Sequence, residues 1–219
     1  YNDISKRTNG EFYLGVCGPV RTGKSTFIKK FMEMFVLPGI RDENDRKRAM
    51  DELPQSAEGK TIMTTEPKFI PKEAVKINLF DGNDIKVRMV DCVGYIVEDA
   101  GGLMEGERER MVMTPWSEEP MPFAKAAEYG TKKVIHDHST IGIVITTDGS
   151  FGDISRQSYK AAEDKTISEL KSIGKPFIVI VNSANPFGEK AKDVINEIKE
   201  RTGVTPVALN CIQLSREDV

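Results

Sequence analysis

Residues 12–26 read FYLGVCGPVRTGKST, and the order of their features predicts the kind of fold. Residues 12–16 are mostly apolar and predict a short buried strand, while residues 25–35 show the amphipathic spacing of a helix. Between them, residues 18–25 match the pattern GxxxxGK[ST], which forms a phosphate-binding loop when a strand precedes it and a helix follows. The stretch therefore predicts an α/β protein with a P-loop.

The loop and the start of the following helix form the expected nucleotide site. Backbone N–H groups and the positive end of the helix attract phosphate oxygens, Lys24 adds a charge beside the outer phosphates, and Ser25 offers a hydroxyl to Mg²⁺. We expect the following residues to contact the nucleotide: Gly18, Pro19, Val20, Arg21, Thr22, Gly23, Lys24, Ser25 and Thr26. A second GKT at residues 59–61 has Pro54 where the first Gly should stand and no strand before it, so it cannot form the same loop.

Two further motifs could bind a metal ion and contact a γ-phosphate: DCVG at residues 91–94, and the pair Thr64 and Thr65. Asp91 ends an apolar run and begins DCVG; an Asp at this place can hold Mg²⁺ through water, and the N–H of Gly94 can sense the γ-phosphate. The alternative is that Asp91 only caps a turn. Thr64 and Thr65 either supply the hydroxyl and carbonyl of a switch loop, in either order, or start an edge strand. We expect Ser25, Thr64, Thr65 and Asp91 to surround the metal.

The expected reaction centre departs from that of common GTPases. Many switch GTPases carry a Gln directly after DxxG that orients the attacking water. This chain has Tyr95 there, so a Gln-based mechanism is excluded at this position. Arg21 lies inside the P-loop, and RTGKS looks like the P-loop of large dimerising GTPases that carry a built-in arginine finger. Arg21 either stabilises phosphate charge in this way or is a solvated or ion-paired side chain. The expected catalytic set is Lys24, Thr64, Thr65, Asp91, Gly94 and Arg21.

Residues 177–186, FIVIVNSANP, resemble the base-reading strand of a GTPase but lack the Asn-Lys-x-Asp that normally follows. The Asp of that motif accepts two hydrogen bonds from guanine and would be repelled by the acceptor nitrogen of adenine. Here the corresponding positions are Asn182, Ser183 and Asn185, and an amide can both donate and accept. Asn185 therefore either pairs with adenine or makes no base-specific contact. In both cases ATP is favoured over GTP.

The rest of the chain alternates strands and helices, which predicts a parallel sheet covered on both faces. Apolar runs at residues 75–80 and 85–90 flank Asp-Gly, a strong signal for an antiparallel hairpin. The remaining elements are expected as strands at 141–146, 177–181 and 207–210, and as helices at 156–173 and 190–201.

Two stretches interrupt this alternation. Residues 38–71 are rich in charge, Pro and Thr, and we expect an irregular loop with one helix at 43–50. Residues 94–133 form an insertion within the domain. Within the insertion, residues 98–121 show no regular spacing of apolar residues. Residues 123–137, which run past its end, predict a helix interrupted or loosened at Gly130.

The composition excludes several classes of protein. The 219 residues, 30% charged and 39% hydrophobic, suffice for one large domain and are unlike a disordered or membrane protein. The formal net charge of −3 argues against a nucleic-acid-binding surface, so no nucleic acid is expected as a partner. No apolar run reaches the roughly 20 residues of a transmembrane segment. The three cysteines form neither a CxxC pair nor a Cys/His cluster, which fits a reducing cytoplasm.

Five blocks of sequence carry a family resemblance: GPVRTGKSTFIKKFME, DELPQSAEGKTIMTTEPKF, VDCVGY, TPWSEEPMPF and HSTIGIVITTDG. Together they resemble the N-terminal ATPase domain of the stage IV sporulation protein A family, over essentially all 219 residues. That family belongs to the translation-factor-related class of P-loop NTPases, most of which are GTPases, but it uses ATP. The resemblance implies a six-stranded, mostly parallel sheet with one antiparallel edge strand and helices on both faces.

The resemblance also implies a biological setting. Hydrolysis of ATP in the family drives self-assembly into a static polymer, the basement layer of the spore coat, on the outer forespore membrane in the mother-cell cytoplasm. The implied partners are further copies of the protein, as a homopolymer or homodimer, other spore coat proteins, and a small amphipathic peptide that anchors the layer to the membrane. Lys24 carries over as the phosphate-binding lysine, Asp91 as the acidic residue of the Mg²⁺ site, and Thr64 and Thr65 as the sensor threonines.

The leading hypothesis is an Mg²⁺-dependent ATPase domain over residues 1–219, a piece of a longer protein. Its hydrolysis would change the conformation of residues 38–71 and 94–121 and expose an assembly surface, because γ-phosphate contacts can order two loops and are lost on cleavage. The alternative is a GTP-binding switch that recruits a partner without polymerising. A small-molecule kinase fits less well, because the sequence has no Arg-rich lid pattern.

Overall fold

Six strands form the main sheet in the computed structural model: β1 (Glu11–Cys17), β2 (Lys68–Phe80), β3 (Asn83–Asp91), β8 (Ile141–Thr147), β9 (Phe177–Asn182) and β10 (Val207–Leu209). Their order is β10-β9-β8-β1-β3-β2, and all neighbours run parallel except β2, which pairs with β3 in the antiparallel sense. The structure describes residues 11–54, 67–80, 83–97, 99–101, 103–105 and 108–218. The prediction of a mostly parallel sheet with one antiparallel edge strand is confirmed.

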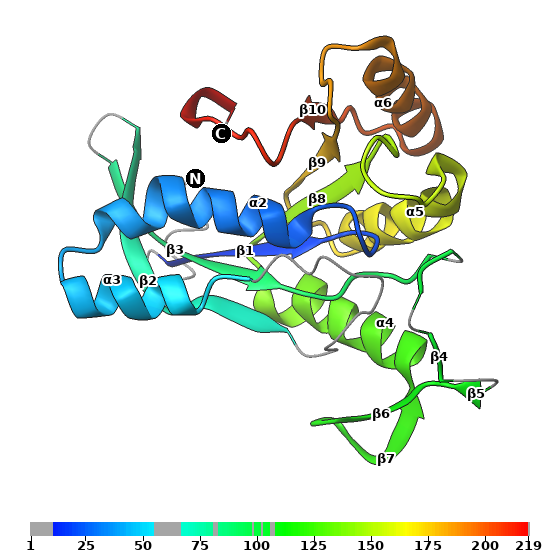
Figure 1. The fold of residues 1–219 in the computed structure, drawn as a ribbon, viewed down its shortest axis with the longest axis horizontal. Helices are drawn as coiled ribbons and strands as arrows, with labels where there is room; N and C mark the ends of the chain where they lie inside the picture. The colour runs from blue at the N-terminus through cyan, green and yellow to red at the C-terminus, as the bar shows by residue number, and fades with distance from the viewer. Residues whose placement is uncertain are drawn as a thin grey trace.

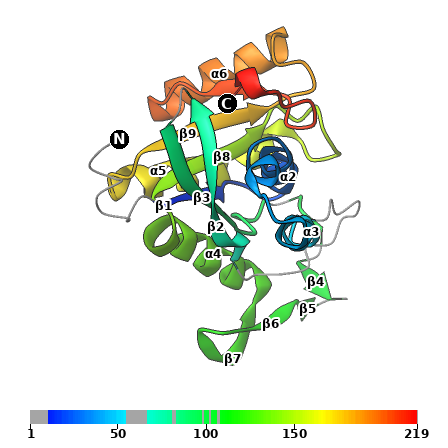
Figure 2. The same ribbon diagram turned by 90° about the vertical axis from the view of Figure 1, so that its left-hand side faces the viewer.

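Helices lie on both faces of this sheet (Figures 1 and 2). α2 (Lys24–Phe31) and its π-helical continuation η1 (Met32–Val36) bury their apolar side on one face, next to β1 and β3. The π-helical turn η3 (Val134–His138), α5 (Arg156–Ser172) and α6 (Glu189–Thr202) pack on the other face. Among the described residues, no helix is both long and apolar enough to cross a membrane.

The register of the strands brings the carboxyl ends of the parallel strands to one edge. Val16 of β1 is opposite Asp91 of β3, and Thr147 of β8 is opposite Asn182 of β9. Ligands of open α/β sheets bind outside these carboxyl ends. The P-loop begins directly after Cys17, so it lies at the same edge.

The region around residues 38–71 is only partly as expected. α3 (Glu43–Asp51) confirms the predicted helix, and its N-terminus is capped by Asp42, whose carboxylate accepts a hydrogen bond from Asp45 N at 2.9 Å. The prediction of an irregular end to the stretch was wrong, because β2 already begins at Lys68. Pro71 is tolerated there because β2 is an edge strand, and its register with β3 shifts between Ile70 and Val75.

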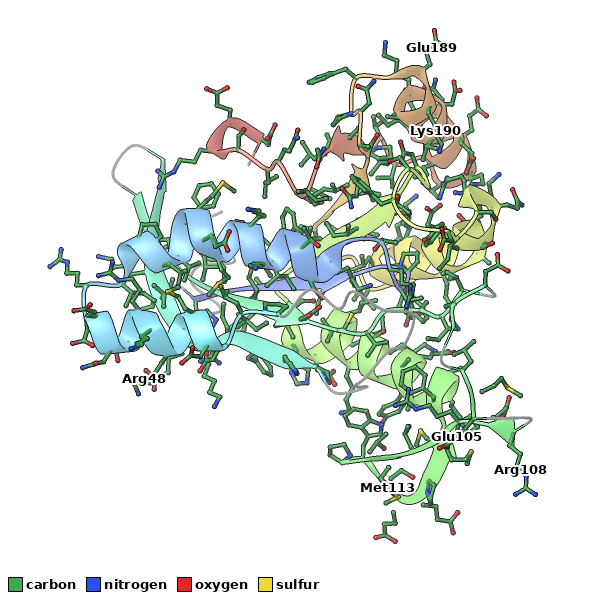
Figure 3. The ribbon with its side chains drawn as sticks, viewed as in Figure 1. Arg48, Glu105, Arg108, Met113, Glu189 and Lys190 are labelled. Atoms are coloured by element: carbon green, nitrogen blue, oxygen red, sulfur yellow. The ribbon has the colours of Figure 1, made fainter. Side chains whose placement is uncertain are left out.

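The insertion contains strands that the periodicity did not predict. Two small hairpins pair β4 (Met104–Glu105) with β5 (Arg108–Glu109), and β6 (Met111–Thr114) with β7 (Ser117–Pro122). They extend away from the main sheet, with Glu105, Arg108 and Met113 on the outside (Figures 1 and 3). A two-stranded hairpin buries little apolar surface. Its strands therefore need no alternation of apolar and polar residues, and the sequence pattern does not reveal them.

α4 (Phe123–Lys133) follows the hairpins and corrects a second prediction. The helix is continuous through Gly130, which is buried, and the loosening occurs later, in η3. The β6–β7 hairpin and the residue before it are held to α4 by aromatic contacts. The Trp116 and Tyr129 rings lie 5.6 Å apart, and the Arg110 guanidinium lies 4.7 Å from the centre of the Phe123 ring. Trp116 therefore fastens the insertion to the domain.

Candidate nucleotide-binding site

The P-loop connects β1 to α2 in a conformation that depends on positive backbone φ angles. Gly18 has φ 122° and Gly23, which caps α2, has φ 97°. A Cβ atom on Gly18 would stand 2.4 Å from the carbonyl oxygen of Ile145, so glycine is required there. Arg21 also has a positive φ, 61°, which is uncommon for a residue with a side chain. These positive φ angles give the loop the tight turns that a phosphate cradle is predicted to have.

Lys24 and Thr22 are buried beneath the loop. Lys24 is 6% exposed, and its ammonium donates a hydrogen bond to the carbonyl oxygen of Pro19 at 2.6 Å. Burial lowers the pKa of Lys24, while the nearby Asp91 carboxylate opposes this. Thr22 Oγ1 lies 2.7 Å from the carbonyl oxygen of Ile145 in β8 and stabilises the back of the loop. Thr26, also predicted to contact the nucleotide, lies in the first turns of α2.

Asp91 and Ser25 lie together at the end of β3. Ser25 Oγ donates a long hydrogen bond, 3.4 Å, to Asp91 Oδ2. Asp91 Oδ1 is buried and has no hydrogen-bond partner among the described residues. Burial raises the pKa of Asp91 to about 6, and the Lys24 ammonium opposes this rise. A buried carboxylate oxygen without a donor next to a hydroxyl fits a small hard cation such as Mg²⁺, which takes oxygen ligands.

The segment after Asp91 lies directly on the P-loop. Gly94 has φ 94°, and a Cβ atom there would stand 2.1 Å from the carbonyl oxygen of Gly18 and 2.8 Å from Lys24 Nζ. Tyr95 N donates to Gly18 O at 3.2 Å, and Val20 N donates to Tyr95 O at 2.9 Å. The structure thus places Gly94 beside Lys24, the predicted phosphate-binding lysine, as the DxxG motif leads us to expect.

The Tyr95 side chain points away from this site. It is 3% exposed, its hydroxyl is buried without a hydrogen-bond partner in the described part of the chain, and burial raises its pKa. The Lys165 ammonium lies 4.9 Å from the centre of the ring. Tyr95 occupies the position of the usual Gln but cannot orient a water at the phosphates, because its polar atom lies in the core.

Asn182 connects three parts of the site. It is 4% exposed; its Nδ2 donates to the carbonyl oxygen of Thr22 at 3.1 Å, and its Oδ1 accepts from Cys211 N at 3.0 Å. The amide therefore joins the end of β9 to the P-loop and to the segment after β10. Cys211 was not predicted as a site residue, because only the folded chain brings its N–H to Asn182.

Ser183 and Asn185, the other two residues of the predicted base-reading loop, differ in burial. Ser183 is buried, and its Oγ donates to Asp148 Oδ2 at 2.6 Å. Asp148 also accepts from Ser150 N at 2.9 Å, in the turn that follows β8. Asn185 is exposed, and its backbone N donates to Ser183 Oγ at 3.1 Å. Its side chain is thus open to a ligand, whereas Ser183 is committed to Asp148.

Two predicted sets need separate mention. Thr64 and Thr65, and the second GKT at residues 59–61, lie outside the described residues. The Arg21 side chain is exposed beside α5, where its charge opposes the rise in the Tyr159 pKa that burial causes. The described residues contain no group of three His, Cys, Asp or Glu side chains that could hold a metal.

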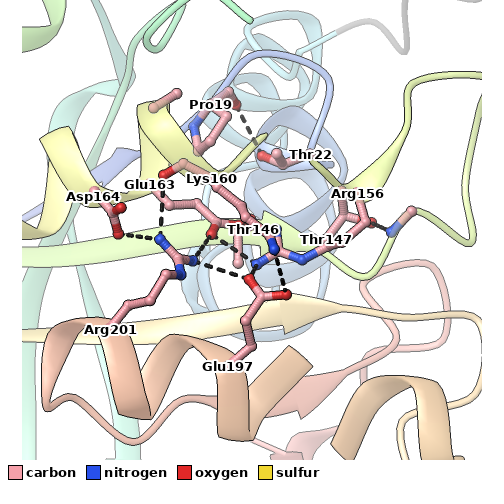
Figure 4. A network of polar contacts seen from close by, with 12 residues as sticks. Pro19, Thr22, Thr146, Thr147, Arg156, Lys160, Glu163, Asp164, Glu197 and Arg201 are labelled. Atoms are coloured by element: carbon pink, nitrogen blue, oxygen red, sulfur yellow. Dashed lines mark hydrogen bonds and ion pairs between the residues drawn. The ribbon is translucent and has the colours of Figure 1, made fainter. Parts of the chain in front are cut away.

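A buried ion network behind the P-loop escaped prediction (Figure 4). Glu163 of α5 is fully buried and accepts hydrogen bonds from Thr146 of β8, from Arg156 at 2.8 Å and from Arg201 of α6 at 2.7 Å. Glu197 joins both arginines, at 3.0 Å and 3.2 Å. The network fastens α5 and α6 to the strand below the loop. The sequence did not indicate this network, because charged residues within a helix are usually exposed to solvent and carry no sign of burial.

Comparison with known proteins identifies the family. The family description "Stage IV sporulation protein A, ATPase domain" matches residues 1–219. Over these 219 residues the chain is 54% identical to stage IV sporulation protein A of Bacillus subtilis (strain 168) and 55% identical to that of Clostridioides difficile (strain 630). All of this chain is covered, but only 44% and 45% of those relatives.

A solved structure, "Crystal structure of a probable GTP-binding protein engB", aligns with a TM-score of 0.44 at 13% identity, covering 91% of this chain and 88% of that one. This likeness is too distant to bear on ligand or activity. The chain belongs to the family of the stage IV sporulation protein A ATPase domain.

Proposed function

We propose that this chain is an Mg²⁺-dependent ATPase that cleaves the β–γ phosphoanhydride bond of ATP, and that hydrolysis drives assembly of the basement layer of a bacterial spore coat. The observation that carries the proposal is the convergence of Lys24, Asp91 and Gly94 at the P-loop. A cation, a carboxylate and a glycine N–H at one phosphate cradle are the parts that nucleoside triphosphate hydrolysis needs.

Asp91 and Ser25 would hold the metal. The unpartnered Oδ1 of Asp91 and the hydroxyl of Ser25 suit Mg²⁺, and Thr64 and Thr65 remain the candidates to complete the set from the switch loop. When bound, the ion would neutralise negative charge on the β- and γ-phosphates. Because Asp91 is partly protonated near pH 6, a bound cation would also keep this carboxylate ionised.

Lys24 and the loop amides would bind the phosphates. The ammonium now bonds Pro19 O, and this contact can be exchanged for a phosphate oxygen without exposing the charge. Val20 N now donates to Tyr95 O, so phosphate binding at this amide would move the segment after Gly94. Cleavage of the γ-phosphate would reverse the movement. This exchange is a route from hydrolysis to the insertion that follows Tyr95.

Arg21 is proposed to stabilise charge at the transition state. Its side chain is exposed, and its charge acts on Tyr159 of α5. An arginine supplied to the γ-phosphate is worth about 10³–10⁵-fold in rate in related phosphoryl transfer. Tyr95 cannot act in its place, because its hydroxyl lies in the core.

The base is proposed to be adenine. Asn185 is exposed at the end of the base-side loop and can offer both a donor and an acceptor, whereas the carboxylate that selects guanine is absent from this position. Ser183 replaces the lysine that usually covers the base and is held by Asp148. A GTP-binding switch that recruits a partner without polymerising is the alternative.

Family membership supports the wider role. We propose that the whole protein acts in the mother-cell cytoplasm at the outer forespore membrane, where copies of it form a static polymer, bind coat proteins and meet a small amphipathic anchoring peptide. No nucleic acid or transmembrane segment has a part in this proposal.

One experiment tests the proposed function. Phosphate release from the full-length protein is measured with ATP and with GTP, beside Lys24→Ala, while light scattering follows assembly. We expect turnover with ATP to exceed turnover with GTP, to vanish in Lys24→Ala, and to precede scattering. Higher turnover with GTP would refute the base assignment, and scattering that is independent of hydrolysis would refute the coupling.

A further inference from the structure

A large cavity lies on the η3 side of the main sheet, at the amino ends of β1, β8 and β9. Its volume is about 1070 Å³. Residues of β1, β2 and β3 line one wall, and residues 136–140 and 173–176 line the other. Ligand pockets in proteins commonly hold about 300–1,000 Å³, so this cavity would take a small organic molecule. Neither the P-loop nor residues 91–95 line it, so it is separate from the candidate nucleotide site.

Arg88 extends from β3 between two aromatic rings in the wall of this cavity. Its guanidinium carbon lies 5.7 Å from the centre of the Tyr13 ring and 5.6 Å from the centre of the Phe69 ring. The rings come from opposite sides, because β1 and β2 flank β3 in the sheet. Phe69 in turn meets the His138 ring edge-on, with 5.4 Å between the ring centres. These contacts hold the guanidinium in place and leave its N–H edges for hydrogen bonds.

The Arg88 guanidinium has a donor without an acceptor. Its Nε is buried and has no hydrogen-bond partner in the part of the chain that the structure describes. The two acidic side chains of the cavity are engaged elsewhere. Glu11 accepts a hydrogen bond from the Tyr13 hydroxyl at 2.9 Å, and the Asp137 carboxylate lies 3.7 Å from Lys133 Nζ. A buried charged donor that lacks an acceptor is unfavourable, so an acceptor supplied by a ligand would bind there favourably.

The formal charges around the cavity limit the charge of this ligand. Besides two histidines, its ionisable side chains are two bases, Arg88 and Lys175, and two acids, Glu11 and Asp137. The Lys175 ammonium is already occupied, because it donates to two carbonyl oxygens of η3, at 2.5 and 2.6 Å. One cationic group therefore remains for a ligand, in the presence of two carboxylates. A single negative charge suits this cavity better than the two charges of a phosphate group, which the carboxylates would repel.

We propose that the cavity is a further ligand site, which binds a small organic monocarboxylate through a bidentate pair with Arg88. The planar guanidinium fork matches the two coplanar oxygens of a carboxylate. The apolar or aromatic body of the ligand lies against Tyr13, Phe69 and Ile173, which line the cavity around the guanidinium. The inference is independent of the proposed ATPase activity, because the two sites share no residue.

Binding of benzoate to the full-length protein tests the charge of the ligand. Ligand-observed NMR at constant ionic strength measures the Kd of benzoate, with benzamide as its uncharged analogue and inorganic phosphate as a competing anion. We expect benzoate to bind saturably, benzamide to bind about 10-fold more weakly or less, and phosphate to leave benzoate in place. Equal binding of benzamide would show an apolar pocket without an anion site. Displacement by phosphate would overturn the choice of a monocarboxylate.

Arg88→Lys tests the bidentate pair, because it keeps a positive charge and removes the planar fork. The Kd of benzoate is expected to rise by about 10- to 100-fold. Arg48→Lys makes the same replacement on α3, where the side chain is 75% exposed and does not line the cavity, and should leave the Kd within about twofold. A Kd that is the same in both variants would refute the role of Arg88.

A photoreactive monocarboxylate locates the site in the unsubstituted protein, so the test does not depend on how the variants fold. 4-Benzoylbenzoate inserts into nearby C–H bonds on irradiation, and mass spectrometry identifies the labelled residues. We expect labels at residues 13, 69, 138 or 173 that excess benzoate suppresses. Labels only at other positions, or labels that benzoate leaves unchanged, would refute the site. No readout involves ATP hydrolysis, so loss of the proposed function would not imitate any of these results.

Discussion

Gly94 lies directly against Lys24, at a distance that leaves no room for a side chain. A Cβ atom on Gly94 would stand 2.8 Å from Lys24 Nζ and 2.1 Å from the carbonyl oxygen of Gly18. The two residues come from separate strand ends, β3 and β1, and meet because those strands pair in parallel. The contact joins the predicted γ-phosphate sensor to the predicted phosphate-binding lysine.

Gly94→Ala is expected to reduce ATP hydrolysis by about 10²-fold or more, because the new methyl group would displace the P-loop and the lysine. Gly152→Ala is a matched control: Gly152 also has a positive φ, 80°, but a Cβ atom there would meet nothing within 4 Å. Both variants carry the same backbone strain, so steady-state phosphate release separates contact from strain. Equal activity in the two would contradict this reading of the contact.

Asp91→Asn is expected to stabilise the nucleotide-free, metal-free protein at pH 7.5 while lowering hydrolysis. The pKa of Asp91 is about 6 in the fold against 3.8 for the free side chain, so the folded state binds more protons between these values and stability falls as pH rises through them. Removing the charge recovers up to about 3 kcal/mol above pH 6 and nothing below about pH 4.

Thermal unfolding of Asp91→Asn and wild type at pH 4, 5, 6 and 7.5, without Mg²⁺, measures this gain. Asp193→Asn, at an exposed position on α6, serves as control and is expected to follow wild type. A gain that is constant across pH would show that the charge on Asp91 is not its source.

Asn182→Ala is expected to destabilise the domain by about 2–4 kcal/mol, because it leaves two buried backbone groups, Thr22 O and Cys211 N, without their partners. ATP affinity should fall with it, since the P-loop loses its brace. Asn185→Ala, at an exposed position in the same loop, should leave stability within about 0.5 kcal/mol of wild type. Urea unfolding and binding of a fluorescent ATP analogue measure the two effects. An Asn182→Ala variant as stable as Asn185→Ala would argue against the brace.

Arg21→Gly separates the side chain from the strained backbone. Gly tolerates the φ of 61° found at this position, so the stability of the fold is expected to change by less than about 1 kcal/mol. Loss of the guanidinium should lower kcat by about 10³-fold with little change in KM, as for an interaction made only in the transition state. Arg21→Lys should not restore the rate, because an ammonium lacks the planar fork. Wild-type kcat in Arg21→Gly would dispose of the arginine-finger role.

Glu163→Gln is expected to cost about 3–5 kcal/mol of stability, because it leaves Arg156 and Arg201 in a buried site without their anionic partner. Glu197→Gln, on the more exposed side of the same network, should cost about 1 kcal/mol or less. Denaturant unfolding of both variants measures the difference. Similar small losses in both would show that the network is screened by solvent.

Much of the fold could be predicted because its signals are local. The β1, P-loop and α2 order, the antiparallel β2 and β3 pair, and the later alternation of strands and helices each follow from a pattern within about 20 residues. The errors have equally physical causes. β2 begins earlier than predicted because an edge strand tolerates Pro71, and α4 continues through Gly130 because that residue is buried against its neighbours.

The candidate site likewise contains residues that the sequence predicted and contacts that it did not. The spacing of Gly18, Lys24 and Ser25, and of Asp91 and Gly94, was sufficient to predict that these residues lie together, since each motif depends on the backbone conformation of a short segment. The role of Asn182 was not predictable, because its partners are 160 and 29 residues away along the chain.

Only the folded molecule shows that Tyr95 turns into the core, that Glu163 collects two arginines behind the P-loop, and that Arg88 lies between two aromatic rings. Local sequence patterns specify which backbone conformations are favourable. They do not specify which distant side chains meet, because such contacts depend on how whole strands and helices pack, and their free energies appear only when the chain has folded.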